Sequence, residues 1–236
     1  MTEHSRFTAD VNSYESQLYQ SGAPDPVKYH IWFDDFDKYT ATDWLITTTE
    51  AGASSATEAL GIAEGGTLVI TNDAADNDLD FLQWRGGDAA TYESFKFVVG
   101  KELWFKTRFK VSDATQSDFV IGLQITDTTA LAVSDGVYFR KDDGDTNLDH
   151  VIIKDSSGTT STAVHTMVDD TYITCGFYYN GIDAIDVFVN DACVAADVAV
   201  TNMPDDELLT ISFGIQNGEA VAKVMTLDYI SVVQER

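Results

Sequence analysis

The sequence predicts an all-β protein, a β-sandwich or jelly roll, and three observations lead to this prediction. Apolar and polar residues alternate through many short segments, which is the pattern of strands with one buried face. Turn residues such as the Asn180-Gly181 pair separate these segments, and the 236 residues include only 3 prolines. No long amphipathic helix follows residue 28. Many short strands joined by tight turns are typical of sandwiches and jelly rolls.

The segment from Glu102 to Val111 has the clearest alternation in the chain. One face carries Leu103, Phe105, Thr107, Phe109 and Val111. The other face carries Glu102, Trp104, Lys106, Arg108 and Lys110. We therefore expect a strand whose first face lies in the core, while its second face, basic and bearing a tryptophan, lies at the surface.

The same alternation places the other strands along the chain. The expected strands are 30–36, 43–49, 67–71, 79–85, 92–99, 102–111, 118–127, 136–141, 149–154, 159–166, 171–180, 184–190, 193–198, 208–216 and 222–234. With 44% hydrophobic residues there is material for a sizeable core, so residues 29–236 are expected to form one sandwich domain.

Residues 1–28 differ from the rest, being polar and poor in β-branched residues, and they end at Pro24-Asp25-Pro26. We interpret them as an N-terminal arm, either extended or with a short helix over 8–20. Such a helix would carry the partner-binding candidates Tyr14, Leu18 and Tyr19.

The charge of the chain is strongly lopsided, with 39 acidic residues against 14 Lys plus Arg and a formal net charge of -25. Such a surface repels nucleic acids and anionic membranes, so neither is expected as a partner. No signal peptide or membrane-spanning segment is recognised, and synthesis in the cytoplasm is expected. Cys175 and Cys193 both fall in predicted strands; they can pair if those strands are neighbours, but two buried thiols are favoured over a disulfide.

Candidates for chemistry are few. Asp143, Asp145, Asn147 and Asp149 place oxygens at every second residue, a spacing that can wrap calcium. Leu148 and Lys154 stand where an EF-hand needs glycine and glutamate, so a solvated hairpin tip is the favoured interpretation and no cofactor is expected. Residues 72–78 are a similar weak calcium candidate. The four histidines have no zinc-binding spacing.

Several motifs together resemble one family. They are Trp32–Phe36 followed by Trp44, the strand from Trp104 to Val111, Asp135 to Phe139, and the final strand Thr226 to Val233. Their order resembles the concanavalin A-like (laminin G-like) lectin/glucanase jelly roll, and the last strand resembles that of family 16 glycoside hydrolases. The resemblance covers about residues 30–234 and implies the fold; function depends on the site.

The family 16 enzymes carry Glu-x-Asp-x-(x)-Glu on one strand, which aims nucleophile and acid at the cleft. No Glu of this chain begins such a run, so we expect a protein without enzymatic activity.

The basic face of 102–111 then has two alternative roles. Lys106, Arg108 and Lys110 can neutralise acids on neighbouring strands, which is the favoured role in so acidic a chain, or they can dock a partner together with Trp104.

The acidic composition, the arm and the missing carboxylates resemble the decoration (cement) and head-fibre proteins of tailed bacteriophages. That resemblance implies a virion protein that binds the capsid through its arm and a sandwich edge, as a homo-oligomer with a trimer favoured. The alternatives are a carbohydrate-binding lectin-like module and, ranked last, a polysaccharide-active enzyme with an atypical site.

Overall fold

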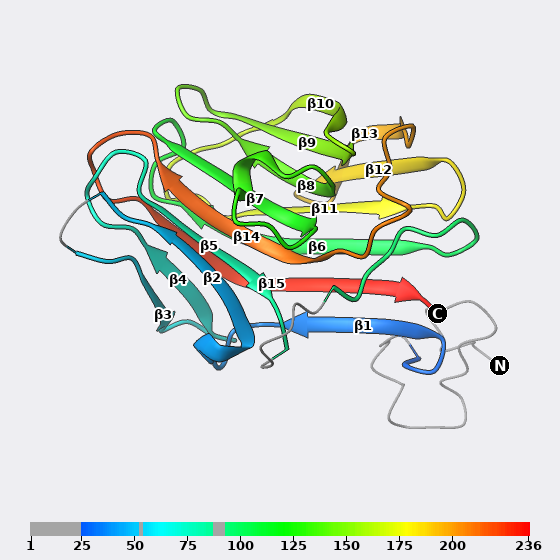
Figure 1. Ribbon diagram of the computed structural model, residues 1–236, viewed down its shortest axis with the longest axis horizontal. Helices are drawn as coiled ribbons and strands as arrows, with labels where there is room; N and C mark the ends of the chain where they lie inside the picture. Colours follow the sequence, from blue (N-terminus) through cyan, green and yellow to red (C-terminus); the bar gives the residue numbers. More distant parts are fainter. Residues whose placement is uncertain (1–24, 52–53, 87–92) are drawn as a thin grey trace.

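The computed structural model describes residues 25–51, 54–86 and 93–236, which form two antiparallel sheets (Figure 1). The strands are β1 (Tyr29–Asp34), β2 (Trp44–Thr49), β3 (Thr57–Gly61), β4 (Thr67–Thr71), β5 (Leu79–Trp84), β6 (Leu103–Val111), β7 (Ser117–Gln124), β8 (Gly136–Lys141), β9 (Asn147–Lys154), β10 (Ser157–Thr166), β11 (Ile173–Tyr179), β12 (Ala184–Val189), β13 (Ala192–Ala199), β14 (Thr210–Asn217) and β15 (Val224–Glu235). Two short 3₁₀ helices, η2 (Ala41–Asp43) and η3 (Ala130–Ala132), lie in connections. No helix among these residues is long and apolar enough to cross a membrane.

Sheet A has the strand order β13-β12-β11-β6-β15-β4-β3, and β1 also pairs with β15. Sheet B has the order β10-β9-β8-β7-β14-β5-β2. In Figure 1, β1 runs beside β15, and the C-terminus lies near the start of β1. The predicted all-β sandwich is therefore confirmed.

The core lies between the sheets and is rich in aromatic side chains. Phe109 of sheet A meets Phe119 of sheet B with ring centroids 5.3 Å apart. Near one edge, Trp32 of sheet A packs edge-on against both Trp44 and Trp84 of sheet B, at 6.2 and 5.3 Å. Edge-to-face aromatic pairs of this kind add to the stability that burial itself provides.

Every expected strand but one is present. The exception is 92–99, where Phe95 and Phe97 are buried as the alternation predicts but the backbone makes only isolated bridges, Phe95 with Leu209 and Val98 with Lys101. One strand, β3, was not predicted; it pairs with β4 and is mostly exposed.

The cysteines do not pair. Cys175 in β11 is buried and Cys193 in β13 is exposed, and both thiols are free. The two strands are separated by β12, which keeps them from being neighbours. The prediction of a buried thiol is confirmed for Cys175 and wrong for Cys193, because β13 pairs only with β12 among the described strands and its side chains are mostly exposed.

Candidate functional site

The outer face of sheet A carries the basic strand face predicted from sequence. In β6 the buried positions alternate with Trp104, Lys106, Arg108 and Lys110, all of which are partly or fully exposed. β6 lies between β11 and β15, so these side chains stand at the middle of the sheet. Trp104, Lys106, Arg108 and Lys110 are therefore brought together on one surface. Tyr14, Leu18 and Tyr19 lie outside the described residues.

Each of the three cations on this face has an acidic partner from a distant part of the chain. Lys106 Nζ lies 3.0 Å from Asp191 Oδ1, and Lys110 Nζ lies 3.3 Å from Asp170 Oδ1. Arg108 forms an ion pair with Asp228 on the neighbouring strand. Exposed pairs like these stabilise a protein by about 0–1 kcal/mol each. Their main effect is to neutralise the face. Only Asp228 lies on a neighbouring strand, as the sequence predicted, whereas Asp191 and Asp170 lie in connections.

A hollow opens on the same face because β11 has a glycine at its centre. Gly176 lies between Lys106 of β6 and Phe188 of β12, and it contributes no side chain to the surface. The hollow has a volume of ≈ 360 Å³, and its rim is formed by Trp104, Lys106, Thr174, Tyr178, Phe188 and Asp191. We call this the sheet A hollow. Small-ligand pockets occupy about 300–1,000 Å³, so its size is at the lower end of that range.

Aromatic rings make one wall of the sheet A hollow. Trp104 stacks on Tyr178 with ring centroids 5.3 Å apart and planes 23° apart. Tyr178 is held by its hydroxyl, which donates to Glu102 Oε1 at 2.5 Å, and burial together with that carboxylate raises the pKa of Tyr178 to about 12. The wall is therefore a neutral, fixed aromatic surface at all physiological pH values.

The first strand brings the start of the described chain to this surface. Tyr29 packs edge-on against Trp104, with ring centroids 6.2 Å apart. Further along β1, Ile31 and Phe33 are 36% and 59% exposed. The C-terminal Arg236 holds this region in place: its backbone N–H donates to Lys28 O at 2.9 Å, and its Nε donates to Pro26 O and Tyr29 O at 3.1 Å.

The outer face of sheet B is covered over its centre. Phe81, Val120 and Tyr138, from β5, β7 and β8, pack under Ala130 and Val133 of the segment around η3 and are at most 2% exposed. Gln83 fixes this segment, donating from Nε2 to Ile125 O at 2.9 Å and accepting from Asp127 N at 3.0 Å. Ala130 and Val133 therefore shield these three side chains from solvent.

The predicted calcium ligands at the β8–β9 hairpin are engaged locally. Asp145 Oδ1 accepts from Asn147 N, and Asp149 Oδ1 accepts from Ala163 N, both at 2.7 Å. The buried ammonium group of Lys141 donates to two backbone carbonyls nearby, and burial lowers its pKa. The positive charge of Lys141 also acts electrostatically on Asp143 and Asp145 of this hairpin.

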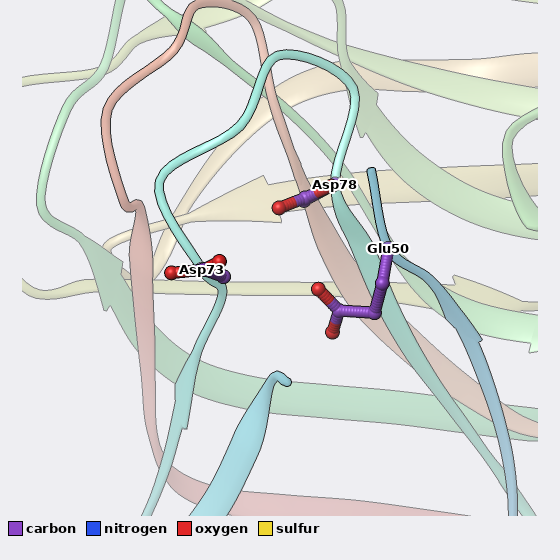
Figure 2. Close-up of side chains that lie close together, drawn as sticks. All are labelled: Glu50, Asp73 and Asp78. Atoms are coloured by element: carbon purple, nitrogen blue, oxygen red, sulfur yellow. The ribbon is translucent and has the colours of Figure 1, made fainter. Parts of the chain in front are cut away.

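Three acids do come together elsewhere in the described chain. Figure 2 shows Glu50 beside Asp73 and Asp78, and one carboxylate oxygen of each lies within 4.8 Å of the others. Asp73 and Asp78 belong to the weaker calcium candidate at 72–78. Glu50 follows β2, and nothing in its sequence surroundings predicted that it would join them.

Comparison with known proteins identifies the fold. A protein of unknown function from Shewanella oneidensis MR-1 matches with a TM-score of 0.61, 18% identity and 97% of each chain covered. A Bacteroides ovatus mixed-linkage glucan GH16 protein, in complex with a product, matches with a TM-score of 0.61, 12% identity, and 85% of this chain and 99% of that one covered. Peanut lectin matches with a TM-score of 0.54, 10% identity, and 88% and 97% covered. The fold is a concanavalin A-like jelly roll.

At these identities the likeness concerns the fold alone, and the fold is found in both enzymes and lectins. No protein-family model matches the chain, and no curated protein sequence matches it. Function must therefore be argued from the jelly roll's own surfaces.

Proposed function

We propose that this protein is a non-enzymatic virion structural protein, a capsid decoration (cement) or head-fibre protein made in the host cytoplasm. It binds the capsid through its N-terminal arm and an edge of the sandwich. The observation that carries the proposal is the contact of Tyr29 with Trp104. Tyr29 begins β1 beside Trp104, on the rim of the sheet A hollow. A partner bound by the arm would therefore also contact the exposed side chains of β1 and the hollow.

The contact is expected to be apolar and aromatic in character. The nearby cations are already paired with Asp191, Asp228 and Asp170, so they do not leave a positive patch for an acidic partner. Trp104, Ile31 and Phe33 remain accessible, and aromatic anchors are favoured at the centres of protein interfaces. The acidic remainder of the surface limits self-aggregation, and a trimer suits a lattice threefold axis.

Two features support a role without catalysis. The sequence lacks the Glu-x-Asp-x-(x)-Glu run of family 16 hydrolases. On the outer face of sheet B, Ala130 and Val133 pack over Phe81, Val120 and Tyr138 and close these side chains to a substrate.

The proposal is tested by co-sedimentation with capsids of the virus that encodes the chain, after the protein has been stripped from them. We expect the full chain to sediment with these capsids and to be oligomeric by light scattering. Trp104→Ala and the triple change of Tyr14, Leu18 and Tyr19 to Ala should each weaken binding by about 10-fold or more. The matched control is Leu60→Ala, an exposed apolar residue on β3, which β15 and β4 separate from β6. Absence of the protein from virions, together with no sedimentation of the full chain, would overturn the proposal.

A second candidate is a carbohydrate-binding module, and the stacked pair Trp104–Tyr178 on the sheet A hollow favours it. An aromatic wall beside polar Lys106 and Asp191 suits a sugar ring, whose faces are apolar and whose edges carry hydroxyls. A glycan-array signal that Trp104→Ala abolishes and Leu60→Ala preserves would favour this candidate over the first. Turnover of any polysaccharide in the same panel would contradict the absence of catalysis.

A further inference from the structure

Three carboxylates from separate segments meet where β2 ends, β4 ends and β5 begins (Figure 2). Glu50 comes directly after β2, while Asp73 and Asp78 stand at either end of the connection from β4 to β5. One oxygen from each residue lies within 4.8 Å of the others, which no other trio of acids, cysteines or histidines achieves in the described chain.

Two buried oxygens at this place lack the hydrogen bond that burial demands. Glu50 Oε1 accepts from Ala56 N at 2.5 Å, but Oε2 is enclosed and accepts nothing. In Figure 2 the Glu50 carboxylate points towards the two aspartates. Asn72, 2% exposed, precedes Asp73, and its amide donates to Asp78 O at 2.9 Å; its own Oδ1 also accepts nothing. Buried polar atoms without a partner are rare in native proteins, so these two oxygens indicate a missing partner, and beside three carboxylates a cation suits that position.

The surrounding backbone fixes the carboxylates in position. Asp78 Oδ1 accepts from Ala51 N at 2.7 Å, which ties the segment after β2 to the start of β5. The fully buried Asn217 donates from Nδ2 to Asp73 O at 2.6 Å and to Ala75 O at 2.8 Å. None of the lysine or arginine ion pairs in the described part of the chain involves Glu50, Asp73 or Asp78, so their negative charges lack a cationic side-chain partner.

We propose that Glu50, Asp73 and Asp78 bind a calcium ion. The donors are all oxygens, without nitrogen or sulfur, which suits a hard cation. Calcium accepts irregular sets of six to eight oxygens, whereas magnesium demands a near-ideal octahedron, so calcium fits carboxylates that come from three separate positions. The ion joins the end of β2 to the β4–β5 connection and satisfies the enclosed Glu50 oxygen. This site is independent of the docking role proposed for sheet A.

The test is thermal unfolding and calorimetric titration of the full chain after treatment with a chelator. Calcium at about 100 times its Kd should raise Tm by about 5–10 °C above a sodium chloride control of equal ionic strength. That control is needed because any salt screens the net charge of -25. Titration should show one calcium per chain.

Glu50→Gln and Asp73→Asn keep side-chain shape and remove one charge each, so each should abolish most of the calcium-specific shift. The matched control, Asp145→Asn, removes one charge from the β8–β9 hairpin and should keep the full shift. Two variants are used because either one alone could fail to fold. The proposal is overturned if the wild-type chain binds no calcium, or if it gains no more Tm from calcium than from sodium chloride. A shift retained in both site variants also overturns it.

Discussion

Asp80 offers the sharpest test of the physical reasoning, because folding makes its carboxyl group harder to ionise. It is 0% exposed and lies on the face of β5 that carries Leu82 of the core. Thr48 Oγ1 donates to its Oδ1 at 3.1 Å, while its Oδ2 accepts nothing. Burial, and then the adjacent carboxyl of Glu58, raise the pKa of Asp80 to about 8.

The sign and size of the effect follow from linkage. An aspartic acid in the unfolded chain has a pKa of about 3.9, so the folded protein holds this proton more tightly. The contribution to stability is therefore complete below about pH 4 and is lost as the pH rises to about 8. Each pKa unit corresponds to about 1.4 kcal/mol, or ~6 kcal/mol for the whole shift. Because part of this shift comes from the interaction with the neighbouring Glu58, we assign about half, ~3 kcal/mol, to Asp80 alone.

Asp80→Asn keeps an acceptor for Thr48 and cannot ionise. Urea unfolding in the presence of a chelator, which keeps the proposed calcium site beside Asp80 empty, is followed by tryptophan fluorescence. The variant should be more stable than wild type by ~3 kcal/mol near pH 8, and this gap should shrink steadily as the pH falls towards ~5. Asp142→Asn, at an exposed residue paired with Arg140, controls for the loss of one negative charge from an acidic protein. A gap that does not change with pH, or a variant less stable than wild type near pH 8, would refute the reasoning.

Two further predictions concern other buried groups. Cys193 should react with a thiol reagent in the native protein, whereas Cys175 should react only after unfolding, because burial encloses the Cys175 thiol and raises its pKa. Counting the thiols that react before and after unfolding checks this, and one reactive thiol per native chain is expected. Lys223→Met should lower the free energy of unfolding by about 3 kcal/mol. The buried ammonium group lies 2.7 Å from both Asp113 and Glu219, and its loss leaves these acids without their partner. A free energy of unfolding in urea equal to that of wild type would contradict this prediction.

The sequence predicted most strands because alternation reports which side chains face a core. It does not report whether a neighbouring strand offers hydrogen bonds. Phe95 and Phe97 alternate and are buried, yet their backbone meets only isolated bridges, so the expected strand 92–99 does not form. β3 shows the reverse case: Thr57–Gly61 has few apolar residues, and its pairing with β4 makes it a strand on an exposed edge. Backbone pairing of that kind leaves no pattern in the side chains.

The candidate sites were only partly predictable, for a related reason. The outward direction of Trp104 and Lys106 follows from the period of two, and the structure confirms it. The hollow between them depends on Gly176 arriving opposite Lys106, from 70 positions further along the chain. Glu50 likewise reaches Asp73 and Asp78 only because β2 pairs with β5. Such meetings depend on strand order, which local alternation does not encode.

The small number of lysines and arginines explains both the neutral face of β6 and the three acids at Glu50, Asp73 and Asp78. Of the 14 lysines and arginines, at least six pair with acids in the described chain, and three of these neutralise the face of β6. A chain with 39 acidic residues has too few cations to do this everywhere. Elsewhere an ammonium group balances the nearby acids: Lys223 forms an ion pair with Asp113, and the charge of Lys141 acts on Asp145. Glu50, Asp73 and Asp78 lie together without such a side chain, and the proposed calcium ion balances their charge. Because the cations beside Trp104 are already paired, the proposed partner docking there depends on aromatic contact, and its affinity should vary little with salt. The proposed calcium binding at Glu50 depends on charge, so its affinity should fall as ionic strength rises.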